Sequence, residues 1–473
     1  MIHLPANPGI SGWSGILSPR QAHKQLDENL NADYLVIGAG FAGLSAARRL
    51  NQLQPDAKIV VLEACEVSEG PAGRNSGFMI DLPHDLSSDD YLGSVEKDIE
   101  QTLINRSAIE FAKSASEEYQ MPSEALQQVG KTNAAATPKG MAFNADYAKH
   151  LTKTGEDYRL LDANQMRDLT GIDYYQGGLW TPGAALLQPA LYIQGLADGV
   201  AQYSNLHLYE NSPVIDLIDE GKHDGQTLWK AKTRLGSVTS PKVILAVNGL
   251  IEKFGYFQNR LMHIFTYASM TRQLSSEEVE SLGGQAEWAF TSADPMGSSI
   301  RRLSGIGGDR IMVRNRFTYD PSMEVSQSRM TAVSSSHISA FNARFPMLDK
   351  VSMEYCWGGR LCLSLNNVFA QGEVAEGVYS ACCQNGLGTA KGTAIGIISA
   401  EKASGTKESL VPNFKTEEAP KKLLPKPLMW ISVNNYIITM DRTKWAYQTL
   451  RIIVFDMLCH KHIFYIITMS LCT

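Results

Sequence analysis

Residues 33–53 read "DYLVIGAGFAGLSAARRLNQL" and contain the pattern that decides the fold. The apolar run Tyr34–Ile37 is typical of a buried strand. It ends at a turn with the spacing Gly38, Gly40 and Gly43, and the residues that follow have the apolar spacing of a helix. The stretch therefore predicts a strand, a tight turn and a helix in direct succession.

A second strand and an acidic residue complete this unit. The segment "AKIVVLEA" (57–64) contains a second apolar run, so strand, helix and strand form a βαβ unit. Gly38 permits the tight turn, and Gly40 lets a pyrophosphate approach the backbone at the helix N-terminus. Glu63 follows Gly43 by 20 residues, where a carboxylate can bind ribose hydroxyls. Together these features predict a dinucleotide site in an α/β fold.

The bulk composition limits the classes of protein that fit. A chain of 473 residues is expected to form two domains, or one with a large insertion, and 44% hydrophobic with 19% charged residues is a globular composition. A net charge of −6 argues against a nucleic-acid partner. The seven cysteines are odd in number and lack zinc-ligand spacing, so we expect no metal and a reducing, cytoplasmic location. The N-terminus has no signal-peptide pattern.

Three further segments favour a long cofactor. A predicted β-meander over 213–248 runs into "LAVNG" (245–249), and "EGPAGRNSG" (69–77) stands where an NAD-binding domain normally begins its next helix. Near the other end of the chain, "QNGLGTAKG" (384–392) predicts a second glycine turn before a helix N-terminus, again a favourable place for an anion. A cofactor bound by both ends of the chain favours FAD over NAD.

These motifs, with "WGGR" (357–360), resemble the D-amino-acid-oxidase-like (DAO) FAD-dependent oxidoreductases. That family includes glycine and sarcosine oxidases and the gamma-glutamylputrescine oxidase-type amine oxidases, to which the likeness is greatest. The resemblance implies an α/β fold (α+β overall), with an FAD-binding Rossmann-like βαβ domain and a second, mixed β-sheet substrate-binding domain. The expected bounds are 31–137, 186–255 and 358–405 for the FAD-binding domain, 138–185 and 256–357 for the substrate-binding domain, and 406–473 for a linker and C-terminal tail.

The resemblance also assigns cofactor-binding residues. Those expected near the ADP half and along the meander are Gly38, Ala39, Gly40, Phe41, Ala42, Gly43, Glu63, Ala64, Val214, Asn248 and Gly249. Those expected near the pyrophosphate and the flavin are Gly73, Arg74, Asn75, Ser76, Gly77, Trp357, Gly359, Arg360, Asn385, Gly386, Leu387, Gly388 and Thr389. No cysteine falls where some relatives tether the flavin, so we expect FAD to be bound non-covalently.

Four residues are candidates for the substrate side. His84 follows the flavin loop, and His263 and Tyr267 alternate on one face of a predicted strand. Arg302, in "SSIRRLSG" (298–305), lacks the tyrosine that accompanies a similar arginine in some relatives, so a surface ion pair is an equal alternative. The segment "VGKT" (129–132) resembles the end of a phosphate-binding loop. We do not interpret it as one, because Ala125 stands where the first glycine of that motif belongs.

The resemblance implies oxidation of the C–N bond of a small amine or amino acid. Hydride would pass to the flavin, the imine would hydrolyse, and O2 would accept the electrons. Two alternatives stay open: a dehydrogenase that passes electrons to a quinone or another acceptor, and a non-catalytic flavin-binding protein. The apolar tail 451–473 raises the first alternative, although charged residues interrupt it and an irregular extension is expected rather than a membrane-surface helix.

Overall fold

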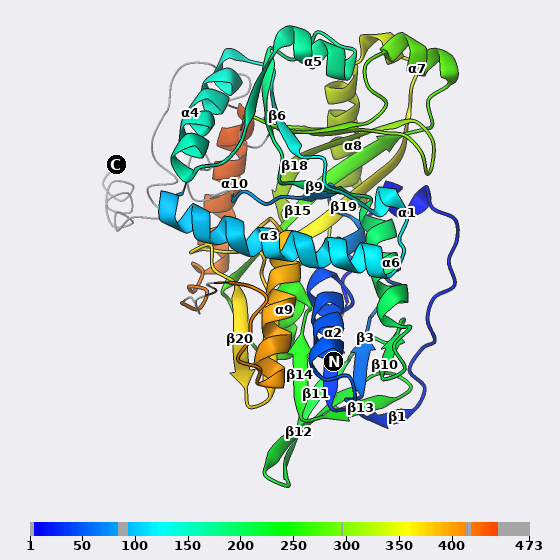
Figure 1. The fold of residues 1–473 in the computed structure, drawn as a ribbon, viewed down its shortest axis with the longest axis vertical. Coiled ribbons are helices and arrows are strands. Elements are labelled where there is room, and N and C mark those ends of the chain that lie inside the picture. Colours follow the sequence, from blue (N-terminus) through cyan, green and yellow to red (C-terminus); the bar gives the residue numbers. More distant parts are fainter. Residues whose placement is uncertain (1–3, 84–92, 295–296, 413, 415–417, 443–473) are drawn as a thin grey trace.

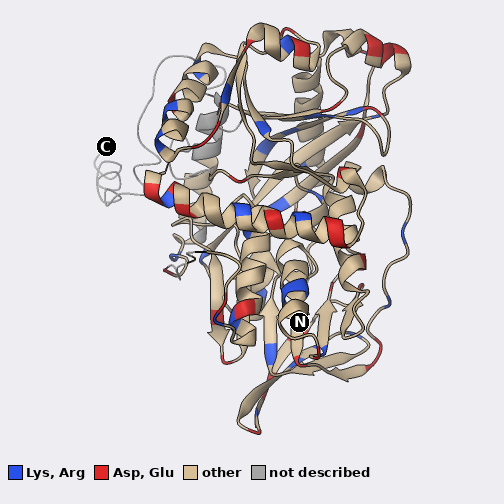
Figure 2. Ribbon diagram, viewed as in Figure 1, with Lys and Arg blue, Asp and Glu red and all other residues tan. Residues whose placement is uncertain are grey.

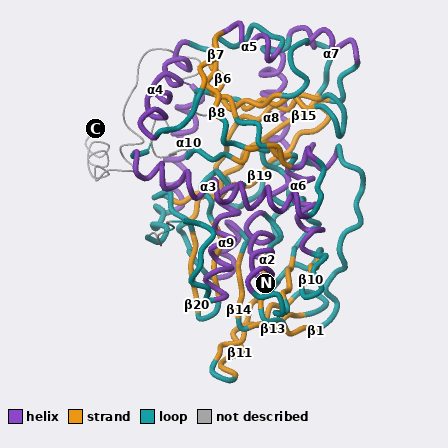
Figure 3. Tube along the Cα trace, viewed as in Figure 1, coloured by secondary structure: helices purple, strands orange, loops and turns teal. Residues whose placement is uncertain are grey.

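The computed structural model describes residues 4–83, 93–294, 297–412, 414 and 418–442. Its strands gather in two groups, one above the other in the views of Figures 1 and 3. Helix α3 (Val95–Glu118) crosses the molecule between them, with charged residues of both signs along its length (Figure 2). The molecule therefore has a lower part that contains the βαβ unit and an upper part built on a larger sheet.

The lower part is built on a six-stranded sheet. Its strand order is β10 (Leu206–Tyr209), β3 (Ile59–Leu62), β2 (Tyr34–Ile37), β14 (Lys242–Leu245), β21 (Val378–Cys382) and β20 (Ala370–Ala375). All neighbouring pairs are parallel except β20 and β21. The buried apolar runs of β2 and β3 explain why they lie at the centre, covered on both faces. The predicted βαβ unit is present at these positions.

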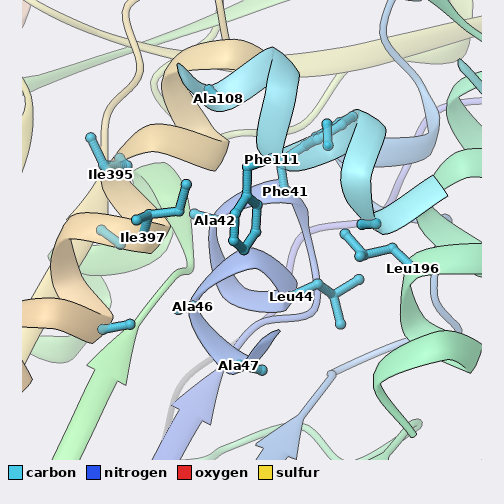
Figure 4. Packing of buried hydrophobic residues seen from close by; sticks show 14 of the residues in the cluster. Phe41, Ala42, Leu44, Ala46, Ala47, Ala108, Phe111, Leu196, Ile395 and Ile397 are labelled. Atoms are coloured by element: carbon cyan, nitrogen blue, oxygen red, sulfur yellow. The ribbon is translucent and has the colours of Figure 1, made fainter. Parts of the chain in front are cut away.

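Two helices from distant parts of the chain lie side by side on one face of this sheet (Figure 1). They are α2 (Phe41–Leu53) and α9 (Ala390–Ser404). Small residues allow the close packing: a Cβ added to Gly396 would lie 2.2 Å from the carbonyl oxygen of Ala42. Figure 4 shows Phe41, Ala42 and Ile397 in the apolar cluster that the two helices share with α3 and α6 (Pro189–Val200). Both glycine turns are thereby brought to the same edge of the sheet.

The other face of the six-stranded sheet is covered by a smaller sheet. Its order is β1 (Asn29–Asn31), β13 (Ser237–Ser240), β12 (Gln226–Lys232) and β11 (Asp216–His223), and the last three form the expected meander. Leu35, Val60 and Val243 of the large sheet pack with Trp229 and Val238 of the small one. Apolar residues alternate along β12, which is why one of its faces is buried and the other exposed.

The upper part is built on an eight-stranded sheet. Its order is β19 (Met353–Ser364), β15 (Leu261–Thr271), β18 (Arg310–Tyr319), β17 (Ser299–Leu303), β16 (Trp288–Ser292), β6 (Lys131–Ala135), β8 (Gly177–Thr181) and β7 (Arg159–Asp162). Helices α4 (Pro138–Thr154), α5 (Ala163–Thr170) and α8 (Gln327–Asn342) pack on it, and α7 (Ser276–Leu282) packs against a 3-10 turn beyond its edge. A three-stranded sheet of β4 (Phe78–Met79), β9 (Ala185–Leu187) and β5 (Leu126–Gln127) lies within the same molecule.

Two segments depart from the expected organisation. Strand β6 falls within the range 31–137 assigned to the FAD-binding domain, but it pairs with β8 and β16 in the eight-stranded sheet. Beyond the linker, helix α10 (Lys426–Arg442) packs on that sheet, because its side chains Met429 and Val433 contact apolar residues of the sheet. The tail 451–473 lies outside the described residues, and the division into two domains stays a proposal. Among the helices that the structure describes, none is long and apolar enough to cross a membrane.

Candidate cofactor and substrate site

The first glycine turn joins β2 to the N-terminus of α2. Gly38 has φ +104°, and a Cβ added there would lie 2.6 Å from the carbonyl oxygen of Ala246. At Gly43 a Cβ would lie only 1.7 Å from the carbonyl oxygen of Gly38, so the helix can approach the turn only because no side chain is present. At Gly40, in contrast, an added Cβ would meet a single atom, Cβ of Ala72 at 3.6 Å. The turn is packed tightly on its inner side and open at Gly40.

Glu63 closes the turn from the end of β3. Its carboxylate accepts hydrogen bonds from the backbone N–H of Ala39 at 2.7 Å, Ala64 at 2.9 Å and Cys65 at 3.1 Å. Burial raises the pKa of the Glu63 carboxyl, and these three N–H donors oppose that rise. The carboxylate is thus fixed at the cavity edge where a ribose hydroxyl is expected.

A cavity of about 610 Å³ extends from this turn to the eight-stranded sheet. Most of the residues predicted to bind the cofactor line it, although they come from seven separate stretches of the chain. They are Gly38, Ala39, Gly40, Phe41, Ala42, Glu63, Ala64, Arg74, Asn75, Ser76, Val214, Asn248, Gly249, Gly359, Arg360, Asn385, Gly386, Leu387, Gly388 and Thr389. The fold therefore brings the predicted cofactor residues together around one space.

Four of the predicted cofactor residues lie behind the wall of the cavity. Gly43 and Gly73 contact backbone, and Gly77 contacts the guanidinium group of Arg301. Trp357 is fully buried and donates its Nε1–H to the carbonyl oxygen of Arg74 at 2.9 Å. These residues support the wall from behind.

The loop 70–77 crosses the cavity and is fixed by its own polar side chains. Asn75 donates from Nδ2 to the carbonyl of Ala72 and accepts the N–H of Gly77 at Oδ1. Arg74 donates to the carbonyls of Pro8, Gly9 and Gly358, and burial lowers the pKa of its guanidinium to about 10. Because its donors are used in this way, Arg74 ties the loop to the N-terminal arm and to β19.

The second glycine turn lies at the N-terminus of α9. Asn385 has φ +50°, and its buried side chain accepts the N–H of Ser364 and donates to the carbonyl of Val368. Thr389 donates to the carbonyl of Phe78 at 2.8 Å, which joins this turn to the loop described above. A Cβ added to Gly388 would meet nothing within 4 Å, so the turn is open toward the cavity.

This arrangement fits FAD. The two glycine turns place two helix N-termini at one cavity, and each end favours negative charge. Gly40 and Gly388 leave backbone accessible where side chains would otherwise occupy the space. Between the turns lie Glu63 and the loop with Arg74 and Asn75. A cofactor with an adenosine end, a pyrophosphate and a flavin ring matches such an elongated lining.

The candidate substrate-side residues are placed differently from one another. His263 lines the cavity, and its Nε2 lies 2.8 Å from Glu252 Oε2. Tyr267 does not line it: Tyr267 packs with helix α8 and hydrogen-bonds Thr318, and burial raises its pKa to about 12. Arg302 donates to the carbonyl of Gly283, away from the cavity. His84 lies outside the described residues.

The face of β15 explains the position of Tyr267. Met262, Ile264 and Thr266 alternate on the side that lines the cavity, whereas Phe265 and Tyr267 point to the opposite side. Tyr267 therefore lies outside the cavity lining, and a substrate-side role for it stays a prediction that this position does not favour. His263 lies on the same face of β15 as Tyr267 and reaches the cavity near the strand end, beside Gly249.

Several residues of the cavity were missed from the sequence. Arg314, which lies 4.5 Å from the ring centre of Phe317, lines it from β18, and Thr291 and Asp294 line it from β16 and the loop after it. The N-terminal arm contributes Leu4, Pro5 and Asn7, and α10 contributes Val433. None of these has a local motif, so pairing within the upper sheet was needed to find them.

Comparisons with known proteins agree with this geometry. A family model described as FAD dependent oxidoreductase (DAO) matches residues 33–402. Among curated relatives, Probable oxidoreductase OrdL of Haemophilus influenzae is 26% identical over 389 residues, covering 80% of this chain and 84% of the relative. Gamma-glutamylputrescine oxidoreductase of Escherichia coli is 24% identical over 361 residues, covering 75% and 79%.

Solved structures share the fold. Glycine oxidase from Geobacillus kaustophilus matches with a TM-score of 0.65 and 15% identity, over 84% of this chain and all of that one (100%). L-amino acid deaminase from Proteus myxofaciens matches with a TM-score of 0.64 and 14% identity, over 87% and 97%. Helix α10 begins at Lys426, beyond the residues that the family model matches.

Proposed function

Because this chain belongs to the DAO family of FAD-dependent oxidoreductases, we propose that it oxidises the C–N bond of a small amine or amino acid. The observation that supports this most is the continuity of one cavity from the dinucleotide turn to the eight-stranded sheet. Such a cavity has room for a substrate beside the flavin end of a bound cofactor. The names of gamma-glutamylputrescine oxidoreductase and glycine oxidase support a substrate of this class.

The residues of the chain bind and orient the cofactor. Glu63 and the turn at Gly40 would hold the ADP half, and Asn75 and Ser76 would lie along the pyrophosphate. The N-terminus of α9 would lie near the pyrimidine end, where its backbone N–H groups favour negative charge. When bound, FAD supplies the hydride-accepting chemistry. The binding is non-covalent.

The substrate side combines charged and apolar groups. Arg314 adds positive charge to this side of the cavity, while Ile264 and Phe317 exclude water from the reacting carbon. His263 is oriented by Glu252 at the boundary between the two halves of the cavity. The substrate must present a neutral amine before hydride leaves, so the site needs a proton acceptor. The imine product hydrolyses, and O2 accepts the electrons.

The test is anaerobic bleaching of the purified yellow holoprotein by a panel of amines, N-methyl amino acids and D-amino acids. We expect at least one small amine or amino acid to reduce the flavin rapidly, followed by hydrogen peroxide release when air is admitted. Reduction without peroxide, but with turnover on an artificial acceptor, would instead identify a dehydrogenase. A flavin that no member of the panel bleaches would favour a non-catalytic flavin-binding protein.

A further inference from the structure

A buried lysine lies directly behind the substrate wall of the cavity. Lys131 is in β6, with 2% of its surface exposed, and its Nζ donates to Asn133 Oδ1 at 2.6 Å and to Thr291 Oγ1 at 3.3 Å. The sheet explains this arrangement: Lys131 and Asn133 share one face of β6, and Asn133 is paired in register with Thr291 of the parallel strand β16. Thr291 also donates to Asn133 Oδ1 at 2.7 Å.

The surroundings of Lys131 do not neutralise its charge directly. Across the part of the chain that the structure describes, Lys131 has no carboxylate within ion-pair distance. The charged group that acts on it is Asp81, which is itself paired with Arg106 at 3.0 Å. Burial therefore lowers the pKa of the Lys131 ammonium to about 8, and Asp81 only partly opposes this. Near neutral pH the amine can both lose and regain a proton.

Thr291 connects this lysine to the cavity. Its side chain lines the cavity beside Asp294 and Ser299, while Lys131 and Asn133 do not reach it. The hydroxyl is thus the one group of this three-residue cluster that a substrate can touch. Asn133 Oδ1 accepts hydrogen bonds from both Lys131 Nζ and Thr291 Oγ1, and this shared acceptor holds the lysine and the hydroxyl at a constant separation.

We propose that Lys131 and Thr291 form the proton acceptor for the substrate ammonium, with Thr291 in contact with the substrate and Lys131 acting through it. This rests on the proposed amine or amino-acid oxidation. When Nζ of Lys131 is neutral, the Thr291 hydroxyl turns from Asn133 Oδ1 to Nζ. One N–H bond of the ammonium then breaks and its proton goes to Thr291 Oγ1, while the O–H proton of Thr291 goes to Nζ. The electron pair stays on the substrate nitrogen, so no redox change occurs in this step. Lys131 is a positioning residue in this scheme.

The pH dependence has a definite sign. Below the Lys131 pKa of about 8 the amine is protonated and cannot accept, and above it the amine is neutral and can. The other titratable groups packed near it are Asp81, Arg106 and Tyr147. Arg106 stays charged, and burial raises the pKa of Tyr147 far above this range. The rate constant for anaerobic flavin reduction at saturating amine should therefore rise about tenfold per pH unit and level off near pH 8.

The decisive variants change the hydroxyl of Thr291, because this change perturbs the protein less than replacing the buried Lys131 would. Thr291→Val should lower this rate constant by about 10²-fold and remove the dependence near pH 8, and Thr291→Ser should restore both. Thr181→Val is the matched control, because Thr181 lies opposite Lys131 on β8 but does not bond to it. All three variants should bind FAD like the wild type. An unchanged pH profile in Thr291→Val, or one that shifts with the pKa of the amine substrate used, overturns the proposal.

A second measurement does not depend on turnover. In holoprotein labelled with 13C at lysine Cε, the signal absent from Lys131→Met should titrate near pH 8. A titration above pH 10 overturns the proposal, whatever the activity. If no amine bleaches the wild-type flavin, the proposed function fails and the catalytic assignment falls with it. If the Lys131 signal nevertheless titrates near pH 8, the lysine has the properties inferred here, and only the reaction proposed for the protein is wrong.

Discussion

Arg301 and Arg302 are neighbours in β17 and point to opposite faces of the sheet. Arg302 donates to the carbonyl of Gly283, away from the cavity. Arg301 donates to the carbonyls of Ser76, Gly77 and Leu187, the last at 2.6 Å, and so supports the loop that crosses the cavity. Burial lowers the pKa of Arg301 to about 10. From sequence the two arginines are equivalent, because only the alternation within the sheet decides which one faces the loop.

We expect Arg301→Lys to weaken FAD binding by about tenfold or more. All three bonds come from Nη1 of Arg301, and the side chain of lysine is one bond shorter, so its Nζ does not reach the position of Nη1. Each buried carbonyl left unpaired costs about 1–3 kcal/mol. The measurement is the FAD dissociation constant from flavin fluorescence during titration of apoprotein. Arg302→Lys is the control and should leave the constant unchanged. Equal effects of the two substitutions would contradict the role assigned to Arg301.

Acid precipitation should release all of the flavin into the supernatant. Cys65 and Cys362 both line the cavity, but burial raises the pKa of the Cys65 thiol to about 11, and a hydrogen bond with Cys383, together with burial, raises the pKa of the Cys362 thiol. The thiolate is the reactive form of cysteine, and neither residue provides it at neutral pH. Absorbance of supernatant and pellet measures the partition. Flavin that stays with the pellet in the wild type, but not in Cys362→Ser, would show a covalent link.

At the scale of elements, α10 is an addition to the wall of the cavity. Met429 is 1% exposed and packs with Ile264 and Tyr319, and Val433 reaches the cavity itself. The segment before the helix is fixed by backbone contacts, including the bond from the N–H of Leu423 to the carbonyl of Asn259 at 2.8 Å. The helix therefore limits the space available on the substrate side.

Substitutions at Val433 should change which substrates fit. Val433→Trp fills part of the cavity and is expected to weaken long amines more than short ones, by about tenfold for each two methylene groups excluded. Val433→Ala should favour the longer ones. Dissociation constants from flavin difference spectra, across a series of increasing chain length, measure this. Trp430→Ala, on the face of α10 where the side chain is 55% exposed, serves as the control. A selectivity that Val433→Trp leaves unchanged would exclude α10 from the substrate wall.

The elements also show which predictions a sequence can support. The strand Tyr34–Ile37 was predicted at its observed bounds and the strand Ile59–Leu62 within the segment 57–64, because glycine spacing and apolar runs are local signals. The face of Tyr267 and the sheet of β6 were not, since both depend on pairing between distant strands. Val433 lies in helix α10, and the apolar side of this helix can be identified only once its contacts with β15 and β18 are known.

At the scale of the whole molecule, the cavity is lined by two sheets that are built mostly from different segments of the chain. The six-stranded sheet contributes the glycine turns, and the eight-stranded sheet contributes the substrate wall. The N-terminal arm adds a third connection, since Arg74 donates to the carbonyls of Pro8 and Gly9 and Arg360 donates to those of Pro5 and Ala6. A cofactor that filled this cavity would contact residues of both sheets, and its binding energy would then stabilise the two parts together.

Removal of FAD should lower the thermal stability of both parts together. At a free FAD concentration 100 times its dissociation constant, binding contributes about 2.7 kcal/mol to the folded state. We expect the melting temperature of apoprotein to rise by several degrees with added FAD, in one transition reported alike by circular dichroism and tryptophan fluorescence. Arg301→Lys should reduce that gain while Arg302→Lys keeps it, because only Arg301 supports the loop at the cofactor. Two separate transitions, of which only one responds to FAD, would show that the cofactor stabilises the lower sheet alone.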